Sequence, residues 1–263
     1  MSIPLAGPRR VRTESLGILV LALTFAAACA SRTDPANALP ETAAVERLRT
    51  SAEAGNVDAA WQLGLRHFTA DGVARDYAAA ASWLQRAADH QYAPAERDLG
   101  ELYRLGLGVA ASLPTSAEWF RRAAEHGDTI AQYNTGVNLR DGQGVSMNHA
   151  EAVRWFQRAA AAGHPQAQEA LAAALLYGLG IERNPPQAFD WLQRAAASGA
   201  VTAQHQLALL YASGDAGPRD IASALEWIYV AVERSSRQRR QTYQAIADDM
   251  ATQATEAEIA EAR

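Results

Sequence analysis

The sequence WFRRAAEHG at residues 119–127 has close copies 36 residues to either side, WLQRAADHQ at 83–91 and WFQRAAAAG at 155–163, and another, WLQRAAASG, at 191–199. A fifth stretch, WIYVAVERS at 227–235, keeps the tryptophan but has drifted. Five of the six tryptophans therefore stand in one 36-residue register, which chance does not plausibly produce. A period of this length is the signature of stacked structural repeats, and it decides the fold.

Each repeat is predicted to hold two helices. An alanine opens the first, and the residues four and eight positions later are mostly leucine and tyrosine, which places three core residues on one helix stripe. A glycine-rich turn follows, and the second helix carries the tryptophan. We call the two helices A and B. The opening alanines of the five A helices are Ala59, Ala95, Ala131, Ala167 and Ala203.

Helix boundaries recur at fixed places in the repeat. A short polar residue stands just before each B helix, where its side chain can accept hydrogen bonds from the first backbone N–H groups. Glycine follows several B helices, where a left-handed residue is needed. The predicted N-caps are Asp76, Ser112, Asn148, Asn184 and Asp220. The predicted helix-end glycines are Gly127, Gly163 and Gly199.

The repeat resembles that of the Sel-one-like repeat family, a relative of the tetratricopeptide repeat. The second repeat carries the resemblance most fully, through Ala95, Leu99, Gly100, Tyr103, Gly106, Gly108, Val109, Trp119, Ala123, Ala124 and Gly127. Local departures are Ala70 and Ala216 in place of turn glycines, and Gln91 and Ser235 in place of helix-end glycines. The repeat and the resemblance together predict an all-α fold, a right-handed α/α solenoid of about five 36-residue repeats with helical caps at both ends.

The predicted organisation has five parts. Residues 1–28 are a signal peptide, 29–40 a flexible tether, 41–58 an N-terminal capping helix, 59–235 the repeats, and 236–263 C-terminal capping helices. The last part includes a helix from Arg237 to Met250 and a capping box at Thr255 and Glu258. Terminal caps are expected because the end repeats of a solenoid must face solvent.

The first 29 residues predict export. Arginines at 9, 10 and 12 precede a 13-residue apolar run at 16–28, which is too short to span a bilayer but suits a signal peptide. Small residues ahead of Cys29 resemble the lipobox of bacterial lipoproteins, which implies lipidation of Cys29, although Ala26 stands where leucine is usual. The alternative is an ordinary secretory signal. We expect an exported, periplasmic protein anchored to the outer membrane.

Composition excludes several kinds of chemistry. All 24 basic residues are arginine, so the chain has no phosphate-loop lysine, Schiff-base lysine or Ser-x-x-Lys pair. The net charge of −5 argues against nucleic-acid binding. His-Glu-x-x-His and Gly-x-Ser-x-Gly are also missing from the sequence. We therefore predict no enzyme activity, no catalytic residues, no cofactor and no metal site.

The resemblance implies that helix A lines a concave wall that binds partners. Positions about 200° around helix A from its core stripe should face that wall. They mix aromatic and arginine residues, which are enriched at interface hot spots, although any single one can equally be an ordinary solvated residue. Trp61, outside the 36-residue register, either contacts a ligand or packs on the N-terminal cap. The predicted wall residues are Trp61, Arg97, Glu101, Arg104, Tyr133, Arg140, Glu169, Tyr177 and His205.

The predicted function is a non-catalytic scaffold for other envelope proteins, held to the membrane by a lipid on Cys29. The alternatives are recognition of cell-wall glycan, with regulation of wall or export machinery, and an outward-facing adhesion factor. One basic cluster has two possible interpretations: a solvated helix face, or a docking patch for anionic lipid or an acidic partner. It consists of Arg234, Arg237, Arg239 and Arg240.

Overall fold

The computed structural model describes residues 41–255 and residue 259. The predictions for residues 1–40 (signal peptide, lipidated Cys29 and tether) and for Glu258 of the capping box lie outside the described residues. The described chain forms twelve helices: α2 (Glu41–Glu53), α3 (Val57–Thr69), α4 (Tyr77–Ala88), α5 (Ala93–Leu105), α6 (Leu113–Glu125), α7 (Thr129–Asp141), α8 (His149–Ala161), α9 (Pro165–Tyr177), α10 (Pro185–Ala197), α11 (Val201–Ser213), α12 (Ile221–Arg234) and α13 (Arg237–Thr252).

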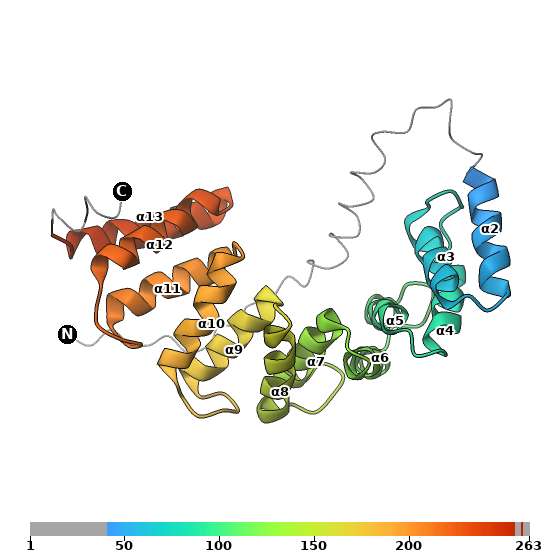
Figure 1. The fold of residues 1–263 in the computed structure, drawn as a ribbon, viewed down its shortest axis with the longest axis horizontal. Coiled ribbons are helices and arrows are strands. Elements are labelled where there is room, and N and C mark those ends of the chain that lie inside the picture. The colour runs from blue at the N-terminus through green and yellow to red at the C-terminus, as the bar shows by residue number, and fades with distance from the viewer. Residues whose placement is uncertain (1–40, 256–258, 260–263) are drawn as a thin grey trace.

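The helices stack in chain order, each packing against the next, and the stack bends into an arch (Figure 1). Helices α3, α5, α7, α9 and α11 are the A helices, and α4, α6, α8, α10 and α12 are the B helices. In the middle of the arch, α5 and α7 lie on the inner side of the curve and α6 and α8 on the outer side (Figure 1). The all-α solenoid predicted from the repeat is confirmed.

Small residues of helix A receive large residues of helix B. Gly136 on α7 faces Phe156 on α8 so closely that an added Cβ would lie 2.5 Å from a ring carbon of Phe156. One repeat further on, the equivalent positions hold Ala172 and Leu192, both fully buried. A larger residue on helix A is therefore matched by a smaller one on helix B, as close packing of a core requires.

Each of the first four register tryptophans carries an arginine on its ring. The guanidinium of Arg122 lies 4.3 Å from the ring centre of Trp119, and the same contact recurs in three other repeats. The arginine is three residues after the tryptophan and so lies on the same helix face. Cation–π attraction of this kind covers the apolar ring while the charge stays near solvent. The tryptophan register is therefore explained by packing within the array.

The predicted caps are confirmed at both ends of helix B. The side chains of Asp76, Ser112, Asn148, Asn184 and Asp220 each accept a hydrogen bond from the backbone N–H three residues later. Gly127, Gly163 and Gly199 have φ of 92°, 88° and 90°. Two departures from glycine, Ala70 and Gln91, keep left-handed backbone with φ of 64° and 60°. There the stack imposes a conformation that costs an L-residue about 1 kcal/mol.

A second glycine in the A–B turn sets the spacing between repeats. Gly108 lies against the backbone carbonyl of Tyr77, the first residue of the preceding B helix, and any side chain at 108 would collide with that backbone. Gly144 and Gly180 make the same contact with the two following B helices. The first four repeats are therefore joined by direct backbone packing that only glycine permits.

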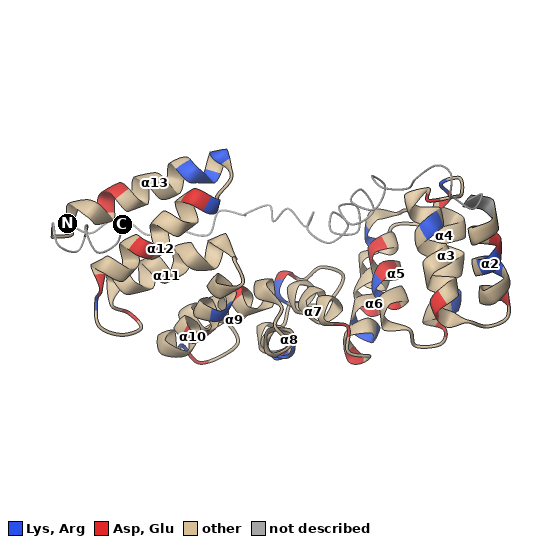
Figure 2. Ribbon diagram, turned by 45° about the horizontal axis from the view of Figure 1, so that its top comes forward, with Lys and Arg blue, Asp and Glu red and all other residues tan. Residues whose placement is uncertain are grey.

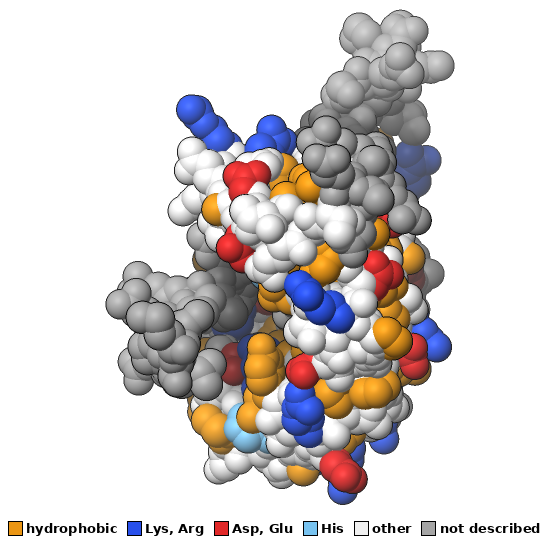
Figure 3. Space-filling model, turned by 90° about the vertical axis from the view of Figure 1, so that its left-hand side faces the viewer, with side chains coloured by type: hydrophobic (Ala, Val, Ile, Leu, Met, Phe, Trp, Pro, Cys, Tyr) orange, Lys and Arg blue, Asp and Glu red, His pale blue; other side chains and the backbone are white. Residues whose placement is uncertain are grey.

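The array ends with a polar surface. Helix α13 begins at Arg237, 36 residues after the start of α11, and so occupies the place of a sixth A helix. Tyr243, Ala247 and Met250 pack inward, whereas most of its other side chains are exposed. Figure 3 looks onto this end of the molecule and shows charged, polar and apolar side chains interspersed. Such a surface suits the last element of a solenoid, which has no following repeat to cover it.

Candidate functional site on the inner face of the array

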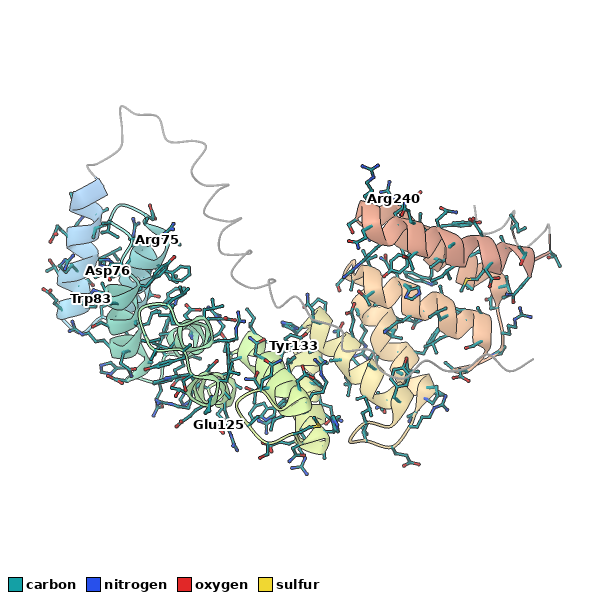
Figure 4. All side chains as sticks on the ribbon, turned by 180° about the vertical axis from the view of Figure 1, so that it is seen from behind. Arg75, Asp76, Trp83, Glu125, Tyr133 and Arg240 are labelled. Atoms are coloured by element: carbon teal, nitrogen blue, oxygen red, sulfur yellow. The ribbon has the colours of Figure 1, made fainter. Side chains whose placement is uncertain are left out.

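The inner face consists of the sides of the A helices that turn away from the B helices. Its first position in each repeat is occupied by Trp61, Arg97, Tyr133, Glu169 or His205. We call this the bridging position, because each of these half-buried side chains contacts the next repeat. Figure 4 shows Tyr133 on the inner side of the arch and Glu125, from a B helix, on the outer side.

In the first repeat the bridging residue is part of a polar network. The indole Nε1–H of Trp61 donates to Oδ2 of Asp98 at 2.8 Å, and its ring lies 5.7 Å from that of Tyr92. Tyr92 in turn donates its hydroxyl to Asp58 on α3. Trp61 therefore packs on the second repeat.

In the second repeat the bridging residue joins two carboxylates. Arg97 donates to Asp98 and, at 2.9 Å, to Oδ2 of Asp128, which is the N-cap of α7. Burial raises the pKa of Asp98, and the charge of Arg97 and the hydrogen bond from Trp61 act against that rise. A guanidinium shared by two carboxylates ties α5 to the start of α7.

In the third repeat the bridging contact is aromatic. The ring of Tyr133 stacks on that of His164, with centres 4.9 Å apart. His164 is the N-cap of α9, and its Nδ1 accepts from the N–H of Ala167. Burial lowers the pKa of His164 and raises that of Tyr133. The cap needs a neutral ring, because a protonated Nδ1 cannot accept a hydrogen bond.

The fourth and fifth bridging residues complete the series. Helix α11 starts after Ala200, which has no side-chain acceptor, and Oε1 of Glu169 accepts from the N–H of Ala203 instead. Burial raises the pKa of Glu169. His205 stacks on Tyr243 of α13 at 4.6 Å, and burial lowers its pKa. All five bridging residues therefore contribute to stacking, which sequence reasoning had not assigned to them.

The other four predicted wall residues divide by charge and exposure. Glu101 is nearly buried and pairs with Arg104 at 2.7 Å. Arg140 pairs with Asp141 through two hydrogen bonds, so its charge is already neutralised within the helix. Tyr177, the last residue of α9, is 72% exposed and is the most accessible of the predicted set.

One inner-face residue escaped the sequence reasoning. Leu209 on α11 is 42% exposed, although it is a leucine in the middle of a helix. It follows His205 by four residues and therefore lies on the same stripe, which was the signal available in the sequence. Aromatic and charged residues mark a binding face more plainly than leucine does, because a leucine in a helix is usually a core residue.

The inner face changes chemistry along the array. Helix α5 contains Glu96, Arg97, Asp98, Glu101 and Arg104, whereas α11 contains no charged residue. Figure 2 shows this contrast between the coloured α5 and the uncharged α11. The second half of the inner face instead presents Ala173, Leu176, Tyr177 and Leu209, which we call the apolar inner face.

A buried carboxylate lies off the inner face. Glu96 is fully buried, 2.7 Å from Nδ1 of His126 and 3.3 Å from Arg122, both on the adjoining B helix. At the equivalent position three later A helices carry Gln132, Gln168 or Gln204, each donating to a carbonyl at the end of the preceding B helix. In the second repeat, the Glu96 cluster therefore takes the place of the glutamine-to-carbonyl hydrogen bond that joins helices in three later repeats. In residues 41–255, histidine, cysteine and carboxylate side chains nowhere gather as a metal site would require.

None of the described helices combines the length and the apolar character needed to cross a bilayer.

The repeats of this chain are similar to those of known proteins. The Sel1 repeat model matches residues 57–92, 93–128, 129–164, 165–199 and 201–236. The structure of a protective antigen present in uropathogenic Escherichia coli strains, displaying an SLR fold, is 34% identical with a TM-score of 0.70, over 72% of this chain and 40% of the antigen's chain. A Sel1 repeat protein from Oxalobacter formigenes is 28% identical with a TM-score of 0.71, over 74% and 80% of the two chains. A search of curated protein sequences finds no match.

Proposed function

Because this chain belongs to the Sel1 repeat family, we propose that it is a non-catalytic scaffold that binds partner proteins along the inner face of its array. One observation carries the proposal. Large side chains, above all Tyr177 and Leu209, are exposed on helices whose positions are fixed by contacts with both neighbouring repeats. Exposed apolar groups on a rigid frame suit protein recognition, because little conformational entropy is lost on binding.

The same proposal places the scaffold in the cell envelope. Its support is the sequence of the first 29 residues, with arginines, an apolar run and small residues ahead of Cys29. Lipidation of Cys29 and a tether over residues 30–40 hold the repeats near the outer membrane on its periplasmic side. The absence of lysine and of nucleophile motifs from the sequence supports a binding role over catalysis.

The test is to crosslink native cell envelopes, recover the protein through a C-terminal tag, and identify what is bound. The control is Cys29→Ala, which removes the lipid anchor and leaves the repeats unchanged. We expect one or a few partner proteins from the wild type and less of them from the control. Recovery of glycan fragments without a protein partner would overturn the scaffold and favour cell-wall recognition.

A further inference from the structure

The apolar inner face is unusual for the exposed side of a helix. Beyond the bridging residues Glu169 and His205, the inner face of α9 and α11 carries alanine, leucine and tyrosine, where exposed helix positions normally carry charge. Leu209 is 42% exposed and Tyr177 is 72% exposed, while Ala173 and Leu176 between them are half-buried. Exposed apolar residues that gather on one face mark a contact site more often than scattered ones do.

Two exposed arginines lie at one edge of this face. Arg237 and Arg239, in the first turn of α13, are exposed and make no ion pair or hydrogen bond with another described residue. Arg240 differs, because it donates to the carbonyl groups of Val232 and Glu233 at the end of α12. Figure 4 shows Arg240 at one end of α13, and Figure 2 shows basic residues gathered there.

Contacts between side chains place these arginines beside the apolar inner face. Tyr243, one turn after Arg239 on α13, stacks on His205, and Leu209 is one turn after His205 on α11. Burial raises the pKa of Glu169 on α9, and the charge of Arg239 opposes that rise. Helices α9, α11 and α13 all begin at this edge, and their N-terminal ends add partial positive charge.

We propose that the apolar inner face, with Arg237 and Arg239 at its edge, binds an acidic amphipathic peptide segment of a partner protein. The inference rests on the proposed scaffold function and names the chemistry of its partner. Apolar side chains of the peptide lie on Leu209 and Tyr177, and its carboxylates pair with the two arginines. A 13-residue helix such as α11 is about 20 Å long, so about six residues of extended peptide span the face.

The position of the face decides against a lipid surface as the occupant. In the middle of the arch the A helices α5 and α7 lie on the inner side, and both ends of the array curve toward the same side (Figure 1). A bilayer is broad and cannot follow this curve, whereas a single peptide segment can. Arginine also suits carboxylate recognition, since its planar guanidinium can bind both oxygens at once.

The test uses random 12-residue peptides displayed on phage, selected against the full-length chain. Enriched peptides are then labelled with fluorescein and their affinities measured by anisotropy. We expect enrichment of Leu, Phe or Trp together with Asp or Glu. Leu209→Glu should weaken binding at least tenfold, and the double variant Arg237→Glu/Arg239→Glu should lose acidic peptides and select basic ones. Circular dichroism confirms that each variant is folded.

The chain offers matched controls. Leu105→Glu makes the same change at the end of α5, where the leucine is equally 42% exposed but neighbours the charged half. Arg154→Glu reverses an exposed arginine on the outer helix α8. Both controls should bind selected peptides within twofold of wild type. Equal losses in the controls, or peptides chosen without acidic residues, would contradict the inference.

The remaining outcomes separate this inference from the scaffold itself. If crosslinking recovers the same partner from wild type, Leu209→Glu and the double arginine variant, the scaffold stands and this face is not its binding site. Capture of no protein and enrichment of no peptide overturns both. Binding of the chain to vesicles containing phosphatidylglycerol, lost in the double arginine variant and unaccompanied by any enriched peptide, assigns the arginines to lipid and overturns the peptide.

Discussion

The second repeat differs from the fifth in how it uses the inner face. In α5 the charged side chains are paired with one another or with the next repeat: Arg97 joins Asp98 to Asp128, and Glu101 pairs with Arg104. In α11 the inner face carries no charge, and contact with the next repeat comes from one aromatic stack. Stacking of repeats therefore does not require a particular inner-face chemistry, which leaves the second half free to present an apolar surface.

The largest effect should come from the bridging position of the first repeat. Trp61→Ala removes a half-buried ring and the hydrogen bond to Asp98, and we expect a loss of about 3 kcal/mol of unfolding free energy. Its counterpart Glu169→Ala removes only the cap on Ala203, with an expected loss of about 1 kcal/mol. Urea denaturation followed by circular dichroism measures both. Equal losses would mean that the two halves stack by the same means.

The next effect concerns the pairs between helices A and B. Gly136→Ala should destabilise by about 2 kcal/mol, because overpacking against Phe156 outweighs the gain in helix propensity of about 1 kcal/mol. Adding Phe156→Leu reproduces the Ala172/Leu192 pair of the fourth repeat and should recover most of the loss. A double variant no more stable than Gly136→Ala would show that the pairs cannot be exchanged between halves.

These pairs also show how far the sequence determined the fold. The 36-residue register predicted the helices, the turns and all five N-caps, because these depend on residues close together in the chain. It did not predict that Ala70 and Gln91 adopt left-handed backbone, since their own preference is the opposite and neighbouring repeats override it. It also did not predict the volume exchange between Gly136 and Phe156, which depends on contact between two helices.

A smaller effect depends on pH. The folded pKa of His164 lies below its ordinary value of 6.5 because the ring is buried. Between those two values the unfolded chain binds the proton more readily, so the contribution of the cap is complete above pH 6.5 and is lost as pH falls through the folded pKa. We expect a loss of about 1 kcal/mol on acidification. His164→Asn caps without titrating, so its denaturation midpoint should change less between pH 7.5 and 5.5.

The smallest effect should be that of Leu209 on stability. Because its side chain is 42% exposed, Leu209→Glu should change the unfolding free energy by less than about 0.5 kcal/mol. Leu207→Ala, two residues earlier on the buried side of the same helix, should cost about 3 kcal/mol. Thermal unfolding of the two variants compares them directly. A large loss in Leu209→Glu would show that the leucine serves the fold.

The candidate site was less predictable than the fold. Helical spacing placed the predicted residues on A helices, but it did not show which of them neighbouring repeats had already engaged. Trp61 and Arg97 bind partners 37 and 31 residues away. In the sequence, nothing distinguishes these two engaged residues from the exposed Tyr177. The exposure of Leu209 was not predictable either, because a leucine in a helix normally indicates a core position.

The turn glycines have a mechanical consequence. Gly108, Gly144 and Gly180 lie directly against the backbone of the preceding repeat, so at these turns the first three joints have backbone contact with no side chain in between. At the fourth joint the sequence has Ala216 at the position of these glycines, and Pro185 opens the preceding B helix. Flexure of the array should therefore concentrate at that joint. Tyr177 and Leu209 belong to the two repeats on either side of it, so each is fixed within its own repeat while the distance between the two side chains should vary more than distances within the first four repeats.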